Sequence, residues 1–471
     1  MRLSQLSDVP ADADVTGFAI DHRKVVPGTV FGAFRGSRVN GEDFIPAAVA
    51  AGAVAVIARP EARVEGAAHI ADEEPRRRFA ALAARFYAPY PDVLVAVTGT
   101  NGKTSTVEMT RQLWRMAGHR SASVGTLGVT TADDQVKTGL TTPDIVTFLS
   151  NMAGLRKLGT THVAYEASSH GLDQYRSEGL PVAAAAFTNF SRDHLDYHGT
   201  MEAYFEAKMR LFDEVVDERG AAVVWTADPK SGDVVERARR RGLRLLTVGP
   251  GGETIDLRSQ QPTPLGQTLI LGHGGKEWTL KLPLIGAYQA ANVLVAAGLV
   301  LATGGNWTQT FAGLGRLSPV RGRLERAVIT PKGAPVYVDY AHTPDALEAA
   351  IAALRPHVEG RLITLFGAGG DRDEGKRPEM GRVAADKSDV VIVTDDNPRT
   401  EDPALIRRAI LQGAPGAREI GGRREAIAAA IAEARRGDIV LLAGKGHETV
   451  QVIGDTVMPF DDAQVARECA A

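Results

Sequence analysis

Short apolar runs alternate with helical patterns through residues 319–471, and this rhythm predicts the elements of that region. We expect strands at Val336–Tyr340, Leu362–Phe366, Val390–Thr394 and Ile439–Leu442. Helical periodicity predicts helices at Thr343–Leu354, Pro378–Ala385, Pro403–Leu411 and Arg424–Arg435. Strands that alternate with helices in this way predict a parallel, doubly wound sheet.

The central region is organised around the apolar run Val93–Val97, which ends in the glycine-rich turn Gly99-Thr100-Asn101-Gly102. A helical pattern then begins at Lys103. A strand, a tight turn and a helix together aim backbone N–H groups and the helix dipole at a phosphate. Lys103 adds a positive charge for the phosphates, and the Thr104 hydroxyl can ligate Mg²⁺. The pattern predicts a nucleoside-triphosphate site with a shortened turn, because Val97 stands where the general motif has glycine. An ordinary βα turn is the alternative.

Other polar groups of the central region follow predicted strands. Glu166 comes directly after the strand Thr161–Tyr165, where it could serve as a second carboxylate directed at Mg²⁺. His194 and His198 stand four residues apart, so a helix would place them on one face. They favour a phosphate or Mg²⁺ environment; zinc is the alternative, although no third soft ligand is close in sequence. Lys208 lies in a helical pattern, where a lysine taken alone is a solvated surface residue.

The first 88 residues predict a small α/β unit. We expect strands at Val30–Phe34 and Ala53–Ala58, and helices at Pro46–Ala51 and Phe79–Phe86. The polar residues around His22 and Ser37 alone indicate solvated loops. The chain is therefore expected to be an α/β protein of three domains. These are a small N-terminal domain at 1–88, a central P-loop ATPase-like parallel-sheet domain at 89–318, and a Rossmann-like domain at 319–471.

Composition limits the possible classes of function. The chain has 471 residues with 54 Lys+Arg, 57 Asp+Glu and a net charge of -3, so it lacks the basic excess of a nucleic-acid-binding protein. The single cysteine, Cys469, excludes an internal disulfide and suits a reducing compartment. The apolar part of the uncharged segment Leu284–Gly315 is only Val293–Ala302, shorter than the ~20 residues of a membrane span. The N-terminus has no apolar core of a signal peptide, so we expect a cytoplasmic enzyme without membrane insertion.

Polar clusters follow all four predicted strands of the C-terminal sheet. They are Asp339–His342, Asp371–Asp373, Asp395–Arg399 and Gly444–Glu448. Parallel strands end at one edge, so four such clusters predict a site there. The turn Gly367–Arg372 resembles a dinucleotide fingerprint, but arginine replaces its third glycine, which excludes NAD and FAD. The residues alone indicate an ATP-using enzyme with two facing α/β sites. A protein that switches on ATP without forming a bond is the alternative.

These motifs also occur together, in order, in a known family. They are TGTNGKTST, LTTPD, EASSHGLDQYR, FTNFSRDHLDYHGTMEAYFEAK, RGRLE, VDYAHTPDAL, GAGGDRDEGKRP, DDNPR and AGKGHE. Over essentially its whole length the chain resembles the Mur ligases, ATP-dependent amino-acid ligases of peptidoglycan synthesis. The resemblance implies that ATP phosphorylates the γ-carboxylate of UDP-MurNAc-L-Ala-D-Glu and that the amine of meso-diaminopimelate attacks the acyl phosphate. DNPR with GDRD argues against the D-alanyl-D-alanine-adding ligases and folylpolyglutamate synthases.

The resemblance also assigns the ATP and metal residues. The ATP contacts are Gly99, Thr100, Asn101, Gly102, Lys103, Thr104 and Ser105, with Asn292 beside the adenine and Asp339 at the ribose. Arg323 matches a γ-phosphate contact made across the domain gap, and Thr104 with Glu166 matches the ligands of one Mg²⁺. His194 belongs near a second Mg²⁺. Lys208 matches a lysine that the family carbamylates with CO₂, which turns a cation into an oxygen ligand and replaces the solvated interpretation. The implied catalytic set is Lys103, Lys208, His194 and Arg323.

The two remaining substrates are assigned in the same way. The uridine and dipeptide contacts are Ile20, His22, Ser37, Arg38, Val39, Thr141, Thr142, Ser168, Gln174 and Arg176. The diaminopimelate contacts are Arg372, Asp396, Asn397, Pro398, Arg399, Gly444 and Glu448. Lysine lacks the distal carboxylate of diaminopimelate, and a guanidinium reads a carboxylate with two hydrogen bonds, so Arg399 predicts diaminopimelate over L-lysine.

Three positions depart from the family pattern: His22 replaces serine, while Leu140 and Gln289 each replace asparagine. None belongs to the phosphate turn or to the Arg399 pocket, so we expect activity to be retained. We also expect the chain to act as a monomer.

Overall fold

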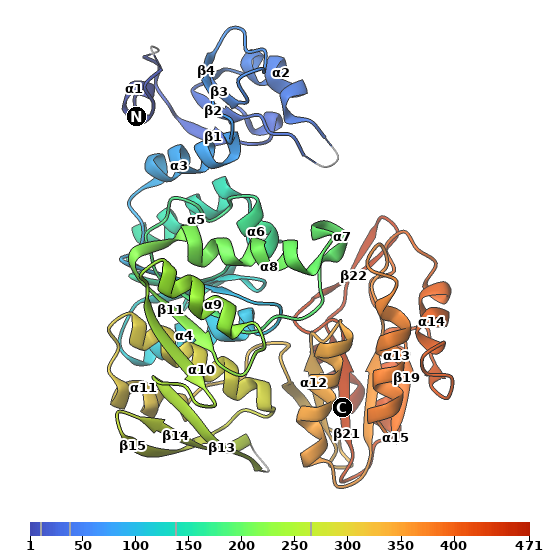
Figure 1. The fold of residues 1–471 in the computed structure, drawn as a ribbon. Helices are drawn as coiled ribbons and strands as arrows, with labels where there is room; N and C mark the ends of the chain where they lie inside the picture. Colours follow the sequence, from blue (N-terminus) through green and yellow to red (C-terminus); the bar gives the residue numbers. More distant parts are fainter. Residues whose placement is uncertain (10–11, 37–38, 137–138, 264–265) are drawn as a thin grey trace.

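The computed structural model describes residues 1–471 except 10–11, 37–38, 137–138 and 264–265. Three α/β lobes follow one another along the chain, with the N-terminal lobe on the central one and the C-terminal lobe beside it (Figure 1). Their sheets have four, eleven and six strands, and a separate two-stranded hairpin lies near the C-terminus. In the part of the chain that is described, no helix is long and apolar enough to cross a membrane.

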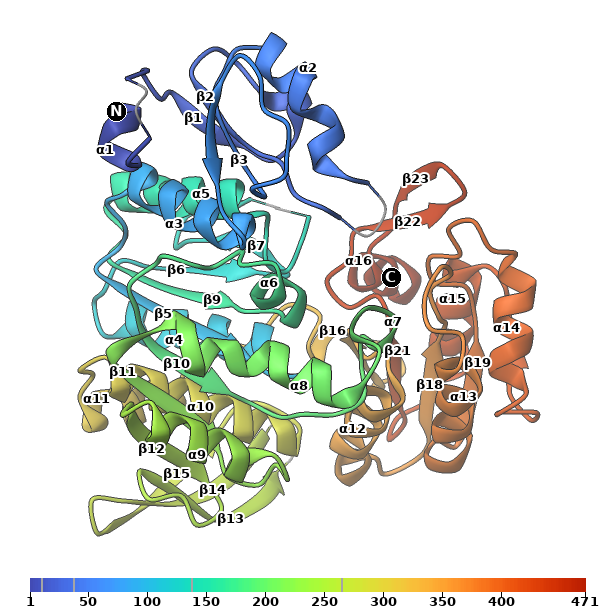
Figure 2. The same ribbon diagram turned by 45° about the horizontal axis from the view of Figure 1, so that its top comes forward.

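The N-terminal lobe is a parallel sheet in sequence order. Its strands are β1 (Gly17–Ala19), β2 (Thr29–Gly32), β3 (Ala53–Ala58) and β4 (Ala68–Ala71), and its helices are α1 (Leu3–Leu6), α2 (Ile45–Ala50) and α3 (Pro75–Tyr87). Helix α2 packs on one face, and α3 packs on the other through Phe79 and Leu82. The core under α3 continues into the central lobe, where Phe148 and Tyr165 belong to the same cluster. Apolar packing therefore seats this lobe on its neighbour (Figure 2).

The central sheet has the order β15-β14-β13-β12-β11-β10-β5-β9-β6-β7-β8. Its middle strands are parallel: β5 (Val93–Thr98), β6 (Ser121–Gly125), β9 (His162–Glu166), β10 (Val182–Phe187), β11 (Val216–Trp225) and β12 (Arg244–Gly249). At one edge, β7 (Gly128–Thr130) and β8 (Gln135–Val136) are added by antiparallel pairing. At the other edge, β13 (Ile255–Thr263) pairs parallel with β12, and β14 (Gly266–His273) and β15 (Lys276–Leu282) follow by antiparallel pairing. The prediction of a parallel sheet is therefore correct for the middle and wrong at the edges.

Helices cover both faces of the central sheet (Figures 1 and 2). One face carries α4 (Lys103–Met116), α10 (Ala287–Ala302) and α11 (Trp307–Leu314); the other carries α5 (Ile145–Lys157), α6 (Ser169–Asp173), α8 (Met201–Arg210) and α9 (Ser231–Arg240). Short α7 (Leu195–His198) precedes α8, and a π-helical turn, Leu211–Val215, follows it. Helix α10 contains the apolar run Val293–Ala302, and it is buried along most of its length.

The C-terminal sheet has the order β16-β17-β21-β18-β19-β20. The strands are β16 (Glu325–Ile329), β17 (Pro335–Asp339), β18 (Leu362–Phe366), β19 (Val390–Val393), β20 (Arg418–Glu419) and β21 (Ile439–Ala443), and only the β16–β17 pair is antiparallel. One face carries α12 (Pro344–Leu354), α13 (Lys376–Lys387) and α14 (Pro403–Leu411), and the other carries α15 (Arg423–Glu433) and α16 (Asp462–Ala470). The doubly wound prediction is confirmed. The hairpin of β22 (Val450–Ile453) and β23 (Thr456–Pro459) was not predicted.

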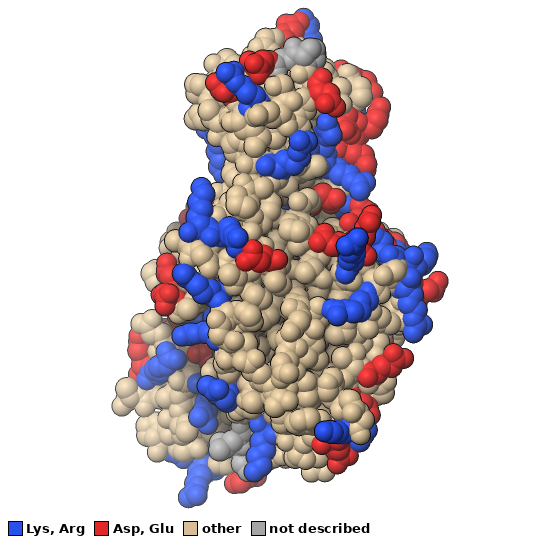
Figure 3. Space-filling view, turned by 90° about the vertical axis from the view of Figure 1, so that its left-hand side faces the viewer, with Lys and Arg blue, Asp and Glu red and all other residues tan. Residues whose placement is uncertain are grey.

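Charged side chains of both signs are scattered among one another on the face drawn in Figure 3, with no large area of one sign. This distribution agrees with the near-balanced composition and differs from the clustered basic surface of a nucleic-acid-binding protein.

Candidate active site

A cavity of about 590 Å³ opens between the central and C-terminal lobes, beside the phosphate turn. Among the predicted residues, its lining includes Thr100 to Ser105, Thr141, Glu166, Ser168, His194, Lys208, Asn292, Arg323 and Asp339. The predicted ATP and metal residues thus converge on one space, although they come from distant parts of the chain. A cavity of this size can hold a nucleotide.

Two glycines shape the phosphate turn between β5 and α4. Gly99 has φ +142 and Gly102 has φ +86, so both sit where side chains are strained. A Cβ on Gly99 would lie 2.0 Å from Thr188 Oγ1, and one on Gly102 would lie 2.3 Å from Asn292 Oδ1. The Asn101 N–H donates to Asn189 Oδ1 at 2.8 Å, which ties the turn to the end of β10. The turn is therefore held rigidly at the N-terminus of α4.

Lys103 folds back over this turn. Its Nζ donates to Gly99 O at 2.9 Å and to Thr100 O at 2.8 Å, and burial lowers its pKa. Arg323 enters from the C-terminal lobe, where its guanidinium donates to Thr104 Oγ1 at 3.2 Å and stacks 4.6 Å from the Tyr340 ring centre. Two cationic side chains therefore flank the turn from two lobes, as transfer of a phosphoryl group requires.

Lys208 is 1% exposed, so its interpretation as a solvated helix lysine is wrong. Its Nζ donates to Gly99 O at 2.8 Å and lies 4.3 Å from the centre of the Tyr204 ring. Burial, with the nearby charge of Lys103, lowers the pKa of this amine well below its usual value. The helical pattern alone could not reveal this, because the neighbours that bury Lys208 include a turn far away in sequence.

Oxygen-bearing side chains that could ligate Mg²⁺ line the same cavity. Glu166 ends β9, and its carboxylate accepts hydrogen bonds from Thr126 N at 2.7 Å and from Thr126 Oγ1 at 3.2 Å. The Thr104 hydroxyl faces the cavity from the first turn of α4. No group of three or more His, Cys, Asp or Glu side chains arranged for a metal occurs within the described residues. A hydroxyl and one carboxylate fit Mg²⁺, which keeps waters and substrate phosphates among its ligands.

His194 lies just before α7 in the left-handed region, at φ +52, so the expected common helix face with His198 is not formed. The two rings instead approach His170, at centroid distances of 4.8 Å and 5.4 Å. Burial lowers the pKa of His194 to about 4, so the ring is neutral near pH 7. Although His170 is close to both rings, the described residues contain no group of three such side chains arranged to hold a metal, so the zinc alternative gains no support.

The predicted adenine and ribose residues form a linked group. Asn292 Nδ2 donates to Gln289 Oε1 at 3.3 Å, and Gln289 Nε2 donates to Arg323 O at 3.4 Å. Asp339 Oδ2 accepts from Leu324 N at 2.7 Å, and burial raises the pKa of this carboxyl. Gln289, one of the departures from the family pattern, is thus part of the contact between lobes.

Four predicted dipeptide contacts are also linked. Thr142 Oγ1 donates to Glu166 O at 2.8 Å and lies 3.0 Å from Ser168 Oγ. Arg176 donates to Thr142 O at 2.8 Å and to Gln174 Oε1 at 2.7 Å.

The predicted uridine contacts that are described, Ile20, His22 and Val39, lie in the N-terminal lobe and do not line the cavity. Ile20 is 38% exposed and Val39 is 58% exposed, while the His22 ring stacks on Phe44 at 4.4 Å. Ser37 and Arg38 lie outside the described residues.

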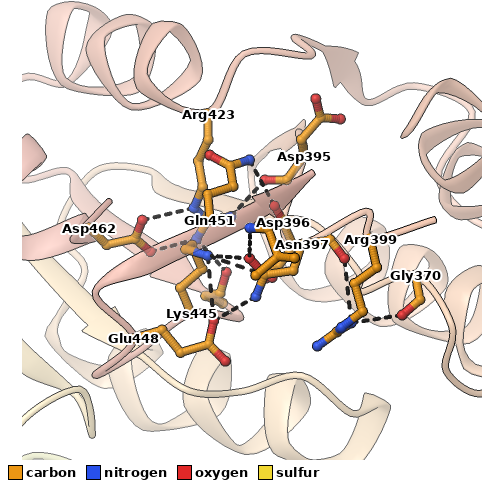
Figure 4. Close-up of polar contacts among 12 residues, drawn as sticks. Gly370, Asp395, Asp396, Asn397, Arg399, Arg423, Lys445, Glu448, Gln451 and Asp462 are labelled. Atoms are coloured by element: carbon orange, nitrogen blue, oxygen red, sulfur yellow. Dashed lines mark hydrogen bonds and ion pairs between the residues drawn. The ribbon is translucent and has the colours of Figure 1, made fainter. Parts of the chain in front are cut away.

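The predicted diaminopimelate contacts lie on the loops after β18, β19 and β21, at the carboxyl edge of the C-terminal sheet, and do not line the cavity. Figure 4 shows four of them: Asp396, Asn397, Arg399 and Glu448. Arg399 has φ +51, and its Nη1 donates to Gly370 O at 2.7 Å. Its backbone pairs with the hairpin, since Gly454 N donates to Arg399 O at 2.7 Å. Asn397 and Glu448 are joined by a 2.7 Å hydrogen bond, whereas Arg372 is exposed. The four predicted strand-end clusters are therefore divided: Asp339–His342 lines the cavity, whereas the clusters after the other three strands do not.

Sequence reasoning assigned no role to several residues at these sites. Thr126 fixes Glu166, and it follows β6, so the rule that ligands collect after parallel strands would have found it. Asp193 lines the cavity, and Lys376 interacts with it electrostatically from the other lobe. That proximity depends on how the lobes meet, which has no local signal. Lys445 lies beneath Asn397.

Family models and known proteins match the chain throughout. Residues 14–89 match the model described as Mur ligase family, catalytic domain; 97–300 match the Mur ligase middle domain; 322–446 match the Mur ligase, glutamate ligase domain. The UDP-N-acetylmuramoyl-L-alanyl-D-glutamate–2,6-diaminopimelate ligase of Zymomonas mobilis subsp. mobilis is 60% identical over 467 residues, covering 98% of this chain and 96% of that protein. The ligase of the same name from Caulobacter vibrioides is 50% identical, covering 98% and 97%.

Solved structures agree. A structure of a UDP-N-acetylmuramoyl-L-alanyl-D-glutamate–2,6-diaminopimelate ligase superimposes with a TM-score of 0.73 at 33% identity, covering 100% of this chain and 98% of the other. MurF from Acinetobacter baumannii, at 19% identity and a TM-score of 0.65 with 94% of each chain covered, shares the fold. On its three matched domains and its near-full-length relatives, the chain belongs to the Mur ligase family.

Proposed function

We propose that this protein is an ATP-dependent ligase that adds meso-2,6-diaminopimelate to the D-glutamate γ-carboxylate of UDP-MurNAc-L-Ala-D-Glu, a step in cell-wall synthesis. The observation that carries the proposal is a phosphate turn facing Arg323 and Asp339 of another lobe across one cavity. The relatives with high identity over nearly the whole chain are ligases of this name. The cavity between the two lobes is where we expect ATP to meet the substrate carboxylate.

The chemistry explains the need for ATP. A carboxylate is a poor electrophile, so its oxygen first takes the γ-phosphoryl group of ATP and ADP leaves. The amine nitrogen then attacks the acyl carbon; the amide bond forms, the carbon–oxygen bond to phosphate breaks, and the amine loses a proton. The turn N–H groups and Lys103 hold the phosphates, while Arg323 stabilises charge from the opposite lobe. Positioning and charge stabilisation are the main demands of phosphoryl transfer.

The residues of the cavity also suit a magnesium ion and a carbamate on Lys208. Thr104, Glu166 and His194 would hold Mg²⁺, which when bound neutralises phosphate charge. We also propose that CO₂ carbamylates Lys208. Its buried amine has a strongly lowered pKa, and a neutral amine is the form that can bond to CO₂ with loss of a proton. The carbamate would supply an oxygen ligand in place of a cation.

Arg399 supports diaminopimelate over L-lysine as the added amino acid. A guanidinium next to a polar strand-end pocket recognises a second carboxylate, and lysine would leave that charge unpaired. We expect Arg399→Ala to raise the KM for diaminopimelate about a hundredfold or more without changing the KM for ATP. Arg418→Ala is the control, because Arg418 forms a surface ion pair with Glu433 in the same lobe. An unchanged KM for diaminopimelate would contradict the assignment.

The decisive experiment is mass spectrometry of the product formed from UDP-MurNAc-L-Ala-D-Glu and ATP with diaminopimelate and L-lysine in competition. The expected product contains diaminopimelate alone. Equal incorporation of lysine contradicts the specificity. Phosphate release that needs neither the UDP-linked dipeptide nor an amino acid favours the ATP-switched protein instead.

We propose that the protein acts as a monomer in the cytoplasm, where ATP and UDP-linked precursors are available. One chain supplies both walls of the cavity. Sedimentation at assay concentration tests the monomer, and a dimer that dissociates with loss of activity would contradict it.

A further inference from the structure

Lys445 is a fully buried lysine beneath the two loops that carry the proposed amino-acid pocket. Its side chain is 0% exposed, and its Nζ donates to Asn397 Oδ1 at 3.0 Å. It also forms ion pairs with Glu448 Oε2 at 3.5 Å and with Asp396 Oδ1 at 4.0 Å (Figure 4). One buried cation therefore contacts three residues of the proposed pocket, from the loops after both β19 and β21.

The backbone around Lys445 leaves little freedom. Gly444 has φ +108 and Gly446 has φ +52, so glycine is favoured on both sides of the lysine. A Cβ on Gly444 would lie 2.6 Å from Asp396 Oδ2, and one on Gly446 would lie 2.6 Å from Tyr340 Cβ. The loop after β21 is thus pressed against its neighbours, and the lysine between the two glycines is the side chain that enters the interior.

The contacts fix the orientation of the Asn397 amide. Its Oδ1 accepts from Lys445 Nζ and from Val452 N, both at 3.0 Å, so its Nδ2 must face Glu448 Oε2, to which it donates at 2.7 Å. A flipped amide would point its N–H groups at an ammonium and an N–H. Lys445 and the Val452 N–H therefore set the amide together, and the amide in turn holds the Glu448 carboxylate.

Asp396 and Glu448 flank the Lys445 ammonium, and the buried Arg423 guanidinium also interacts electrostatically with both carboxylates. Arg399 lies on the other side of the Asn397 backbone (Figure 4). Burial and Asp396 raise the pKa of Glu448, and Lys445 opposes that rise. An ionised Glu448 suits an ammonium group, and Arg399 suits a carboxylate. The ammonium and carboxylate groups of one amino-acid centre would thus be bound from opposite sides of the pocket.

We propose that Lys445 is a positioning residue for the incoming amino acid, holding Asn397 and Glu448 in the arrangement that binds its ammonium group. This inference rests on the proposed function, and it assigns Lys445 no contact with the reacting atoms. Removal of the lysine should weaken amino-acid binding selectively, because the ATP cavity does not include it.

The test measures steady-state ligation by Lys445→Met and Lys445→Gln, with Lys387→Met as the control. Lys387 is a half-exposed lysine of the same lobe, paired with Glu348. Wild-type ligation of diaminopimelate is measured first, and its absence contradicts the proposed function rather than the role of Lys445. We expect Lys445→Met to raise the KM for diaminopimelate about tenfold or more, with the KM for ATP within about twofold. Lys445→Gln keeps a donor for Asn397, so its KM for diaminopimelate should lie between those of the wild type and Lys445→Met.

A double-variant cycle separates positioning from general support of the fold. If Lys445 acts through Glu448, then Lys445→Met with Glu448→Gln should raise the KM for diaminopimelate little more than the worse single change. Three results would each overturn the proposal. They are a double variant whose increase in KM is the product of the two single increases, an unchanged KM for diaminopimelate in Lys445→Met, and equal increases in KM for ATP and diaminopimelate. If thermal unfolding shows that Lys445→Met does not fold, Lys445→Gln decides by the same readouts.

Discussion

Lys208 shows how strongly surroundings can change the chemistry of a single residue. A lysine whose Nζ is buried against Gly99 O and the Tyr204 ring loses much of the stabilisation that water gives to its charge. The exposed Lys230 has the same side chain and pairs with Asp233 at 2.8 Å, with its pKa raised by that hydrogen bond. The pKa values of the two lysines are therefore shifted in opposite directions.

We expect Lys208→Ala to reduce ligation at least about a hundredfold, because an anionic metal ligand formed on this lysine would be lost. Added short carboxylates should restore part of the rate by entering the space left by the side chain. Product formation with and without acetate measures both effects, and Lys230→Ala is the control. Full activity of Lys208→Ala would remove this residue from the mechanism.

At the scale of elements, local sequence patterns predicted the buried strands and the helices that pack on them. Strand β18 and helix α14 begin and end where periodicity placed them, because continuous apolar runs and a proline at a helix start are local signals. The hairpin of β22 and β23 carried no such signal, since most of its residues are exposed. It is anchored instead by Arg399, far away in sequence.

The candidate site, too, was predicted where the signal is local in sequence and missed where it depends on distant contacts. Motif residues on the phosphate turn and at strand ends were identified because their spacing carries the chemistry. The burial of Lys208 and the approach of His170 to His194 were not predicted from spacing, because they arise where segments distant in sequence pack together. For Lys208, only the family resemblance corrected the local interpretation.

The two ends of α4 provide a matched test of the phosphate turn. Gly102 and Gly118 both have positive φ, +86 and +91, but only a Cβ on Gly102 would meet another group, Asn292 Oδ1. Each change to alanine should cost about 1 kcal/mol of stability from backbone strain alone. We expect Gly102→Ala also to lower kcat/KM for ATP about tenfold or more, since the turn must move. Thermal unfolding and ATP kinetics compare the two variants, and equal kinetics would contradict a rigid turn.

Helices α15 and α16 are joined by two ion pairs that differ in burial. Arg423 and Asp462 are both 0% exposed, whereas Arg424 and Glu468 are 53% and 41% exposed. Arg423 also donates to Ala443 O at 3.0 Å, at the end of β21. We expect Asp462→Ala to reduce the free energy of unfolding by about 3–5 kcal/mol, because it leaves a buried guanidinium unpaired. Glu468→Ala should cost less than about 1 kcal/mol. Denaturant unfolding measures both, and similar costs would contradict the role of burial.

At the scale of the molecule, the lobes are joined in two different ways. A continuous apolar core holds the N-terminal lobe on the central one. The central and C-terminal lobes also meet through polar contacts at the cavity, including Arg323 with Thr104 and Gln289 with the Arg323 carbonyl. Polar contacts exchange readily with water, so this second junction is the one that ATP can strengthen.

Arg323 tests that idea, because it belongs to the C-terminal lobe and reaches the first turn of α4. With Arg323→Ala, we expect kcat to fall about a hundredfold, since a cation at the transferred phosphoryl group is lost. We also expect a non-hydrolysable ATP analogue to protect amides of both lobes from hydrogen exchange in the wild type, but mainly those of the central lobe in the variant. Arg321→Ala is the matched control, because Arg321 pairs with Asp461 inside its own lobe. Protection of both lobes in Arg323→Ala would show that ATP joins them without this arginine, through contacts such as those of Asp339.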